Sequence, residues 1–222
     1  MARRRPRLRV LVSAGPTRER VDPVRFLSND SSGRMGFALA EAAARAGHDV
    51  VLVAGPVALA TPKGVRRIDV ESAREMLGAL RAEWRAADAL FMAAAVADWR
   101  PARVLAGKWR AKDGGARRAR IDLVRNPDVL ATLTRGRRDP RRTVVAFALE
   151  TGDGERRARA KLRKKGADWI VLNGPGALNA DTTRLVVLGA SGVRIAIPER
   201  SKRAAARDLV ALLRHGDVLA AS

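Results

Sequence analysis

The chain has 222 residues, which is long enough for one complete α/β domain with a buried core. It contains no cysteine and only two histidines, so disulfides, zinc–thiolate sites, thiol nucleophiles and histidine-rich metal sites are excluded. No apolar run approaches the roughly 20 residues of a membrane-spanning helix, and the basic N-terminal segment lacks the small-residue cleavage site of a secretion signal. These features predict a cytoplasmic protein without a membrane segment.

The formal net charge is +21, from 44 Lys and Arg against 23 Asp and Glu. A strongly basic domain can bind the phosphate backbone of nucleic acid. Here the basic residues are spread over the whole length, no helix-turn-helix, zinc-finger or RNP pattern occurs, and aromatic residues make up only 4%. A nucleic-acid-binding module is therefore the less favoured interpretation. Only seven of the basic residues are lysines, so a retained lysine indicates a specific use of an ammonium group.

Hydrophobic periodicity predicts alternating strands and helices. The expected strands cover residues 8–13, 49–54, 66–70, 89–95, 119–124, 143–148 and 169–172. The expected helices cover residues 34–46, 72–86, 128–135 and 154–165, with Pro127 in the first turn of the third. A hairpin over 184–188 and 193–197 and a last helix over 201–214 complete the chain.

This order of elements predicts an α/β fold, a Rossmann-like parallel sheet with helices on both faces, plus a C-terminal β-hairpin and helix. A single domain is expected over residues 8–222, preceded by a disordered basic arm over residues 1–7. Ligands of such sheets bind beyond the carboxyl ends of the strands. The loops after the first, fourth and later strands are therefore the expected positions of a site.

The loop from Ser13 to Gly36 looks like a phosphate-binding turn with an insertion. Gly15 lets the backbone leave the first strand sharply, and Gly33 and Gly36 open the first helix, where free N–H groups and the helix dipole favour an anion. The loop also holds more hydrogen-bonding side chains than capping requires, namely Ser28, Asn29, Ser31 and Ser32. The alternative is a loop that merely connects two elements.

A nicotinamide-dependent dehydrogenase on this fold would place an acidic residue at the end of the second strand, to hold a ribose hydroxyl. The strand ends Val53-Ala54-Gly55-Pro56, with no carboxylate and no arginine for a 2′-phosphate. This pattern disfavours NAD(P) chemistry. An NAD(P)- or flavin-dependent oxidoreductase stays open as an alternative on the same fold.

Three further segments carry polar residues on or next to predicted strands or helices. Small residues over 93–97 end the fourth strand, and Asp98 follows them, either beside a flat ligand or as an ordinary turn aspartate. Lys108 lies in a loop over 107–112 that could fold over a polyphosphate. Lys161 and Lys165 share one helix face, where like charges cost a few tenths of a kcal/mol unless an anion lies between them. A solvated basic surface is the alternative.

Together these segments resemble phosphopantothenate-cysteine ligase, also called phosphopantothenoylcysteine synthetase, of the bacterial type. The longest matching stretch is SAGPTRERVDPVRFLSNDSSGRMGFALAEAAARAG, over residues 13–47. The other stretches follow in the order typical of the family, at residues 93–100, 107–112, 124–133, 144–151 and 158–173.

The resemblance implies a reaction in coenzyme A biosynthesis. A nucleoside triphosphate, CTP in the bacterial members and ATP as the other possibility, activates the carboxylate of 4′-phosphopantothenate as an acyl-nucleotide, and pyrophosphate leaves. The amine of L-cysteine then attacks to form the amide. Mg²⁺ as a cofactor and a homodimer are carried over in the same way, and the sequence identifies no metal ligands.

The resemblance also implies roles for individual residues. Asn29 matches the asparagine that holds the acyl-nucleotide, and its neutral amide could donate to the carbonyl oxygen of the intermediate without competing as a nucleophile. Lys108 matches the catalytic lysine of a flexible loop, where an ammonium group could balance charge on phosphate and acyl oxygens. The implied nucleotide-binding residues are Gly15, Met92, Ala93, Ala94, Asp98, Lys108, Pro127, Asp128, Val129, Leu130, Phe147, Lys161 and Lys165. The implied substrate-binding residues are Ser31, Ser32, Gly33 and Gly36.

The sequence departs from the family pattern at two points. The lysine loop usually reads K-x-K-K, but here it reads Lys108-Trp109-Arg110-Ala111, so Lys112 alone can compensate and loop closure could differ. Gly174 replaces the usual aspartate after Asn173. Many bacterial members carry a flavin-dependent decarboxylase domain ahead of the ligase. This sequence starts directly at the ligase segment, which leaves a stand-alone enzyme and an excised domain both open.

Overall fold

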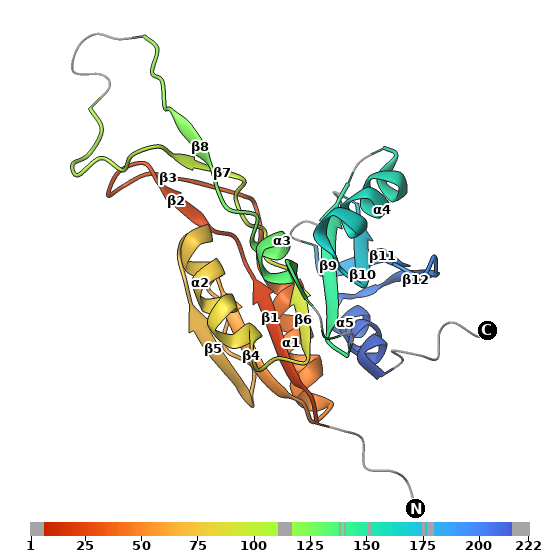
Figure 1. Cartoon of the computed structure of the whole chain (residues 1–222). Helices are drawn as coiled ribbons and strands as arrows, with labels where there is room; N and C mark the ends of the chain where they lie inside the picture. The colour runs from red at the N-terminus through yellow and green to blue at the C-terminus, as the bar shows by residue number, and fades with distance from the viewer. Residues whose placement is uncertain are drawn as a thin grey trace, which may run out of the picture.

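The computed structural model describes residues 7–110, 117–137, 139, 141–150, 152–174, 176 and 180–214. The disordered basic N-terminal segment expected over residues 1–7 lies outside the described residues, apart from Arg7. An eight-stranded sheet forms the centre of the fold (Figure 1). From one edge to the other its strands are β5 (Val65–Asp69), β4 (Asp49–Ala54), β1 (Arg9–Ala14), β6 (Ala89–Met92), β9 (Thr143–Leu149), β10 (Trp169–Asn173), β11 (Thr182–Gly189) and β12 (Arg194–Ser201).

The six strands from β5 to β10 are parallel. The chain builds outward from β1 to β4 and β5 on one side, and from β6 to β9 and β10 on the other, which is the strand order of the Rossmann fold. The antiparallel strands β11 and β12 extend this sheet at one edge. The predicted Rossmann-like sheet with a C-terminal hairpin and helix is therefore confirmed.

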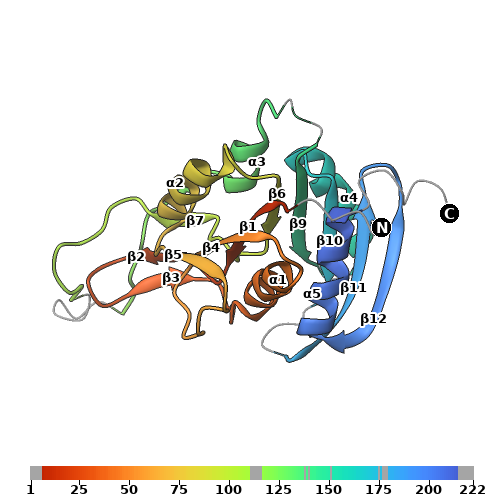
Figure 2. The ribbon, with the colours of Figure 1, turned by 90° about the horizontal axis from the view of Figure 1, so that it is seen from below.

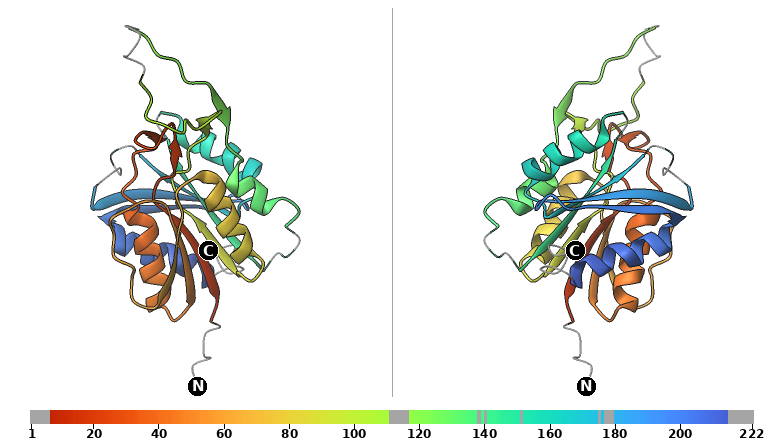
Figure 3. Two further views of the ribbon diagram at one scale, coloured as in Figure 1. Left: turned by 90° about the vertical axis from the view of Figure 1, so that its left-hand side faces the viewer. Right: turned by 90° about the vertical axis from the view of Figure 1, so that its right-hand side faces the viewer.

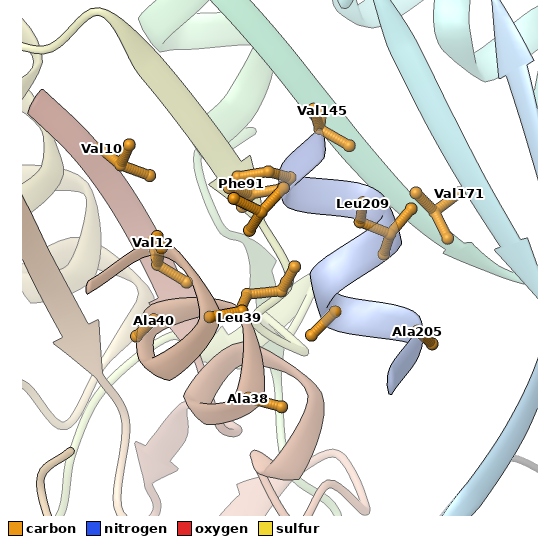
Figure 4. Packing of buried hydrophobic residues seen from close by; sticks show 14 of the residues in the cluster. Val10, Val12, Ala38, Leu39, Ala40, Phe91, Val145, Val171, Ala205 and Leu209 are labelled. Atoms are coloured by element: carbon orange, nitrogen blue, oxygen red, sulfur yellow. The ribbon is translucent and has the colours of Figure 1, made fainter. Parts of the chain in front are cut away.

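Helices cover both faces of the sheet. Helices α1 (Arg34–Arg45) and α5 (Lys202–Ala211) lie on one face, and α2 (Ala73–Trp84), α3 (Val129–Thr134) and α4 (Gly154–Lys165) lie on the other (Figures 2 and 3). Val10 and Val12 of β1 pack with Leu39 and Leu209 of α1 and α5 (Figure 4), while Leu11 packs with the opposite helices. Because successive side chains of a strand point to opposite faces, a strand buried on both faces reads as one continuous apolar run.

Two short ribbons form an arm at the carboxyl end of the sheet, which the sequence did not predict. Strand β2 (Arg18–Arg20) pairs with β3 (Phe26–Ser28), and β7 (Trp99–Pro101) pairs with β8 (Leu123–Arg125), both antiparallel. We call residues 17–28 and the described part of 98–125 the arm; it projects away from the sheet in Figure 1. Of its strands, only β8 overlaps an expected strand, and the expected bounds of 119–124 are wrong because β8 covers Leu123–Arg125. Strands of three residues are too short to show a period.

Two predicted boundaries near the carboxyl end of the sheet are wrong. Helix α3 begins at Val129, with Asp128 as its N-cap, so Pro127 precedes the helix and does not lie in its first turn. The Asp128 carboxylate accepts from the Ala131 N–H at 3.0 Å, which fixes this start. Strand β6 ends at Met92 because the chain then leaves the sheet to follow the loop after β1, where the Ala95 N–H donates to the Gly15 carbonyl at 2.9 Å.

Candidate active site

The site lies beyond the carboxyl ends of β1 and β6, at the point where the strand order reverses. Two adjoining cavities open there. One, of about 400 Å³, lies beside the start of α3 and is called the α3 cavity; the other, of about 490 Å³, lies beside the start of α1 and is called the α1 cavity. Ala94, Val96, Asp98, Phe147 and Lys161 line both. Ligands bound in the two cavities would therefore meet.

Almost all residues singled out from the sequence line these cavities. Those in the α3 cavity are Met92, Ala94, Asp98, Pro127, Asp128, Val129, Leu130, Phe147, Lys161 and Lys165. Those in the α1 cavity are Asn29, Ser31, Ser32, Gly33, Gly36, Ala93, Ala94, Asp98, Phe147 and Lys161. Gly15 and Lys108 are among the lining residues of neither.

Asn29 ties the loop before α1 to the loop after β6. Its side-chain nitrogen donates to the Ala95 carbonyl at 3.2 Å and to the Val96 carbonyl at 3.1 Å. An amide nitrogen has two hydrogens, and here both face the backbone. The oxygen of the amide is therefore the atom able to meet a ligand directly, and it acts as an acceptor. The donor role expected from the sequence would require one of these two bonds to open.

Two buried hydroxyls hold the backbone that both cavities share. The Ser13 hydroxyl accepts from the Ala94 N–H at 3.1 Å, and the Thr17 hydroxyl accepts from the Ala97 N–H at 3.0 Å. Both side chains are fully buried. The sequence did not suggest a role for these two residues, because a single serine or threonine in or beside a strand forms no recognisable motif with its neighbours.

The first turn of α1 has features that favour an anion. Gly33 precedes the helix with a φ of 73°, no side chain caps the helix, and its first turn contains no acidic residue. A Cβ on Gly36 would lie 2.4 Å from the Ala14 Cβ, so the helix starts directly against the end of β1. Ser31, Ser32 and this first turn line the α1 cavity. Uncapped N–H groups at a helix N-terminus favour a bound anion.

The α3 cavity is basic, with one internal ion pair. Lys165 donates to Asp128. The Asp128 carboxylate therefore provides the negative charge beside Lys165 that, from the sequence alone, a bound anion was expected to provide. Burial opposes ionisation of Asp128, but hydrogen bonds from Lys165 and from the Ala131 N–H outweigh it and hold the pKa below its usual value. Lys161, one turn earlier, lines both cavities and so lies near the place where two ligands would meet.

Lys108 lies in the arm, beside a buried carboxylate. The next residue, Trp109, donates its N–H to Asp22 at 2.9 Å and accepts at its carbonyl from Arg25 at 3.0 Å. Asp22 also accepts from the N–H groups of Val24 and Arg25, both at 2.7 Å. These bonds, led by that from Trp109, lower the pKa of Asp22. Lys112, the other lysine of the loop, lies outside the described residues.

Several lining residues were not predicted. Trp99, Asn126 and Lys164 line the α3 cavity, and Arg34, Asn173 and Lys202 line the α1 cavity. Asn126 was quoted within a matching stretch but received no role; its side chain donates to the Ala97 carbonyl at 2.9 Å. Lys164 and Lys202 belong to the seven lysines of the chain, so lysine scarcity was a usable signal for both.

Strand β4 is the second strand of the Rossmann order. As the sequence indicated, it ends without the acidic residue that a nicotinamide-dependent dehydrogenase would place there. Gly55 follows β4, and a Cβ there would lie 1.7 Å from the Pro16 carbonyl oxygen. The loop after β1 therefore occupies the space that a side chain at position 55 would need. Within the described residues, no group of three or more His, Cys, Asp or Glu could hold a metal ion, and no helix is long and apolar enough to cross a membrane.

Comparison with known proteins places the chain in a family. A family model described as the DNA/pantothenate metabolism flavoprotein C-terminal domain matches residues 6–215. The coenzyme A biosynthesis bifunctional protein CoaBC of Mycolicibacterium smegmatis is 43% identical over 215 residues, which cover 91% of this chain and 51% of that protein. The CoaBC protein of Vibrio parahaemolyticus is 48% identical over 164 residues, covering 74% of this chain and 41% of that protein. The chain thus spans about half the length of the curated relatives it matches.

Comparison with solved structures supports the same family. The crystal structure of the C-terminal domain of CoaBC superposes with a TM-score of 0.79 at 37% identity, covering 93% of both chains. A Cab2 variant in complex with phosphopantothenate-cysteine has a TM-score of 0.76 at 15% identity, covering 96% of this chain and 88% of that one, which shows the shared fold. The resemblance seen in the sequence is confirmed, and the chain belongs to the DNA/pantothenate metabolism flavoprotein C-terminal domain family.

Proposed function

We propose that the chain joins 4′-phosphopantothenate to L-cysteine in coenzyme A biosynthesis, through an acyl-nucleotide made from CTP. The observation that carries this proposal is the pair of adjoining cavities, which share Asp98, Phe147 and Lys161. A nucleotide in the α3 cavity and phosphopantothenate in the α1 cavity would bring the α-phosphorus and the carboxylate together at these shared residues. The relatives named for coenzyme A biosynthesis support the same assignment.

In the first step a carboxylate oxygen of phosphopantothenate attacks the α-phosphorus of CTP. A bond forms between that oxygen and phosphorus, the bond to the bridging oxygen breaks, and pyrophosphate leaves. Negative charge grows on the departing phosphates, and Lys161 lies in the wall between the two cavities, where its ammonium group stabilises that charge. The uncapped first turn of α1 provides further N–H donors for anionic oxygens.

In the second step the cysteine amine attacks the acyl carbon. The C–N bond forms, the bond from the acyl carbon to the nucleotide oxygen breaks, CMP leaves, and the amine loses a proton. Asn29 lies in the α1 cavity with its amide nitrogen bound to Ala95 and Val96, so its oxygen can accept from the incoming amine and orient it. Asn29 also holds in place the backbone against which the acyl-nucleotide would lie.

The proposal includes Mg²⁺. Mg²⁺ is commonly bound by one or two carboxylates together with substrate phosphates, and the donors present fit this pattern because Asp98 lines both cavities and Asp30 lines the α1 cavity. Asp98 would hold the ion. When bound, Mg²⁺ would neutralise charge on the phosphate oxygens.

A homodimer formed through the arm is also proposed. Large apolar side chains on the arm are exposed to solvent: Val24, Phe26, Trp99, Val104, Ile121, Leu123 and Val124. Exposed large apolar side chains concentrated on one part of a protein are typical of protein–protein contacts. A second copy of the chain would bury it, and Lys108, which lies in the same arm, would act on the nucleotide in the assembled enzyme.

Incubation with phosphopantothenate, cysteine, Mg²⁺ and either CTP or ATP tests the assignment. We expect pyrophosphate and the phosphopantothenoylcysteine mass to appear together, faster with CTP. Absence of pyrophosphate with both nucleotides would remove the assignment. Omission of cysteine serves as the control, because only the first step should then proceed.

A further inference from the structure

Asp98 is the carboxylate that the two cavities have in common. Among the described residues, Asp98 and Asp128 line the α3 cavity, and Asp30 and Asp98 line the α1 cavity. The Asp98 side chain is exposed, and no hydrogen bond or ion pair with another described residue holds its carboxylate. A side chain without partners of its own takes its position from the backbone that carries it. The placement of this carboxylate between two ligands therefore depends on how the neighbouring peptides are held.

Two side chains from different loops hold the peptide groups of Ala97, the residue before Asp98. Ala97 is buried, so its N–H and its carbonyl need protein partners. The Ala97 N–H donates to the Thr17 hydroxyl at 3.0 Å, and the Ala97 carbonyl accepts from the Asn126 side chain at 2.9 Å. Thr17 lies in the loop after β1, and Asn126 follows β8. Two segments far away in the sequence thus fix one residue.

Asn126 also holds the backbone of Asp98 itself. Its N–H donates to the Asp98 carbonyl at 2.8 Å. Its side-chain oxygen accepts from Arg100 at 3.2 Å, which leaves the amide nitrogen to donate to Ala97. The pairing of β7 with β8 begins at the next residue, where Trp99 lies opposite Arg125. The backbone on either side of the Asp98 side chain is therefore bonded to the protein, although the carboxylate is not.

We propose that Thr17 and Asn126 are positioning residues that act through Asp98. By fixing the Ala97 peptide they hold the Asp98 carboxylate at the place where the nucleotide and its Mg²⁺ bind. The inference rests on the proposed function, in which Asp98 holds the ion beside the phosphate oxygens. Thr17 is fully buried and lines neither cavity, so its effect on a ligand is indirect.

Calorimetric titration of the full chain with CTP in the presence of Mg²⁺ tests this. Thr17→Val keeps the shape of the side chain but removes the hydrogen-bond acceptor, whereas Thr17→Ser keeps the hydroxyl. Loss of a group that orients a metal ligand typically costs about 10- to 100-fold in metal affinity or activity. We expect the affinity for CTP to fall about tenfold in Thr17→Val, the lower end of that range, and to recover mostly in Thr17→Ser. Asn126→Ala should weaken binding in the same direction.

Thr183→Val is the matched control. Thr183 is also buried and lines neither cavity, and its hydroxyl has no hydrogen-bond partner within the described part of the chain. The same replacement of a hydroxyl by a methyl group should therefore leave the affinity for CTP unchanged. If Thr17→Val does not fold, Asn126→Ala carries the test, because Asn126 is only half-buried.

A double-mutant cycle with Asp98→Asn separates a positioning role from a general loss of structure. If Thr17 and Asn126 act through Asp98, their replacement causes little further loss once Asp98 has been changed, because the effects of coupled residues do not add. Additive losses, or unchanged affinity in the variants of Thr17 and Asn126, overturn the inference while leaving the proposed function intact. Unchanged affinity in Asp98→Asn also overturns it. If the wild-type protein does not bind CTP, the proposed function fails first.

Discussion

At the scale of single residues, the amide of Asn29 shows how a polar group can serve the backbone and a ligand together. Its nitrogen fixes the carbonyls of Ala95 and Val96, and its oxygen is left for the cavity. The identity of the residue could be picked out from the sequence through the family resemblance. The direction in which the amide points could not, because it depends on two carbonyls 66 and 67 positions away.

Asn29→Asp should slow the cysteine-dependent step by about a hundredfold, the scale of losing a preorganised polar contact at a reacting centre. A carboxylate cannot donate to the two carbonyls, and its charge repels them. Rapid quenching with mass spectrometry should show the acyl-nucleotide accumulating. Ser28→Ala is the control, since that hydroxyl bonds to the Thr17 carbonyl at 2.8 Å and lines neither cavity. Wild-type turnover in Asn29→Asp would refute the role of the amide.

Asp22→Asn should destabilise the protein in a pH-dependent way. The pKa of Asp22 is lowered in the fold, so its contribution to stability is fully present above the unfolded value of about 3.9 and is lost as the pH falls toward the folded value. Urea unfolding of both proteins should therefore show a difference that is constant near pH 7 and shrinks below about pH 4. If the difference in unfolding free energy between the wild type and Asp22→Asn does not change with pH, the negative charge of Asp22 is not what holds Trp109 in place.

At the scale of elements, the close approach of α1 to β1 sets the anion site. Gly36→Ala places a methyl group 2.4 Å from the Ala14 Cβ, so α1 must shift outward. Overpacking of this kind costs about 1–3 kcal/mol. Urea unfolding measures the loss. Gly78→Ala in α2 is the matched control, with nothing within 4 Å of its added methyl, and should gain up to about 1 kcal/mol. Equal effects in the two variants would contradict the close approach.

Helices and strands with strong periodicity could be predicted, and α4 and β4 begin and end where the sequence indicated. The arm could not, because β2, β3 and β7 have three residues each and are held by pairing with segments far away in the sequence. The position of Lys202 in the wall of the α1 cavity was hidden for a similar reason. The local pattern predicts a helix near residue 201, but only the packing of α5 on α1 brings that lysine to the cavity.

At the scale of the whole molecule, the arm is expected to hold two copies together. Phe26, 39% exposed, is flanked by the guanidinium groups of Arg18 and Arg20 at 4.5 and 5.6 Å from its ring centroid. Phe26→Asp should keep the monomer folded, because the carboxylate meets two arginines, but should abolish dimerisation. Light scattering after gel filtration measures the mass. Leu149→Asp, exposed to 43% outside the arm, is the control and should stay dimeric. An unchanged mass for Phe26→Asp would place the contact elsewhere.

The claim on which the rest depends is that the carboxylate is activated as an acyl-nucleotide where the two cavities meet. Turnover of phosphopantothenate labelled with ¹⁸O in its carboxyl group tests this directly, because the attacking oxygen is transferred to the nucleotide when cysteine displaces it. We predict one ¹⁸O atom in the released CMP, detected by mass spectrometry, with unlabelled pyrophosphate. Unlabelled CMP, or release of CDP with labelled phosphate, would contradict the account.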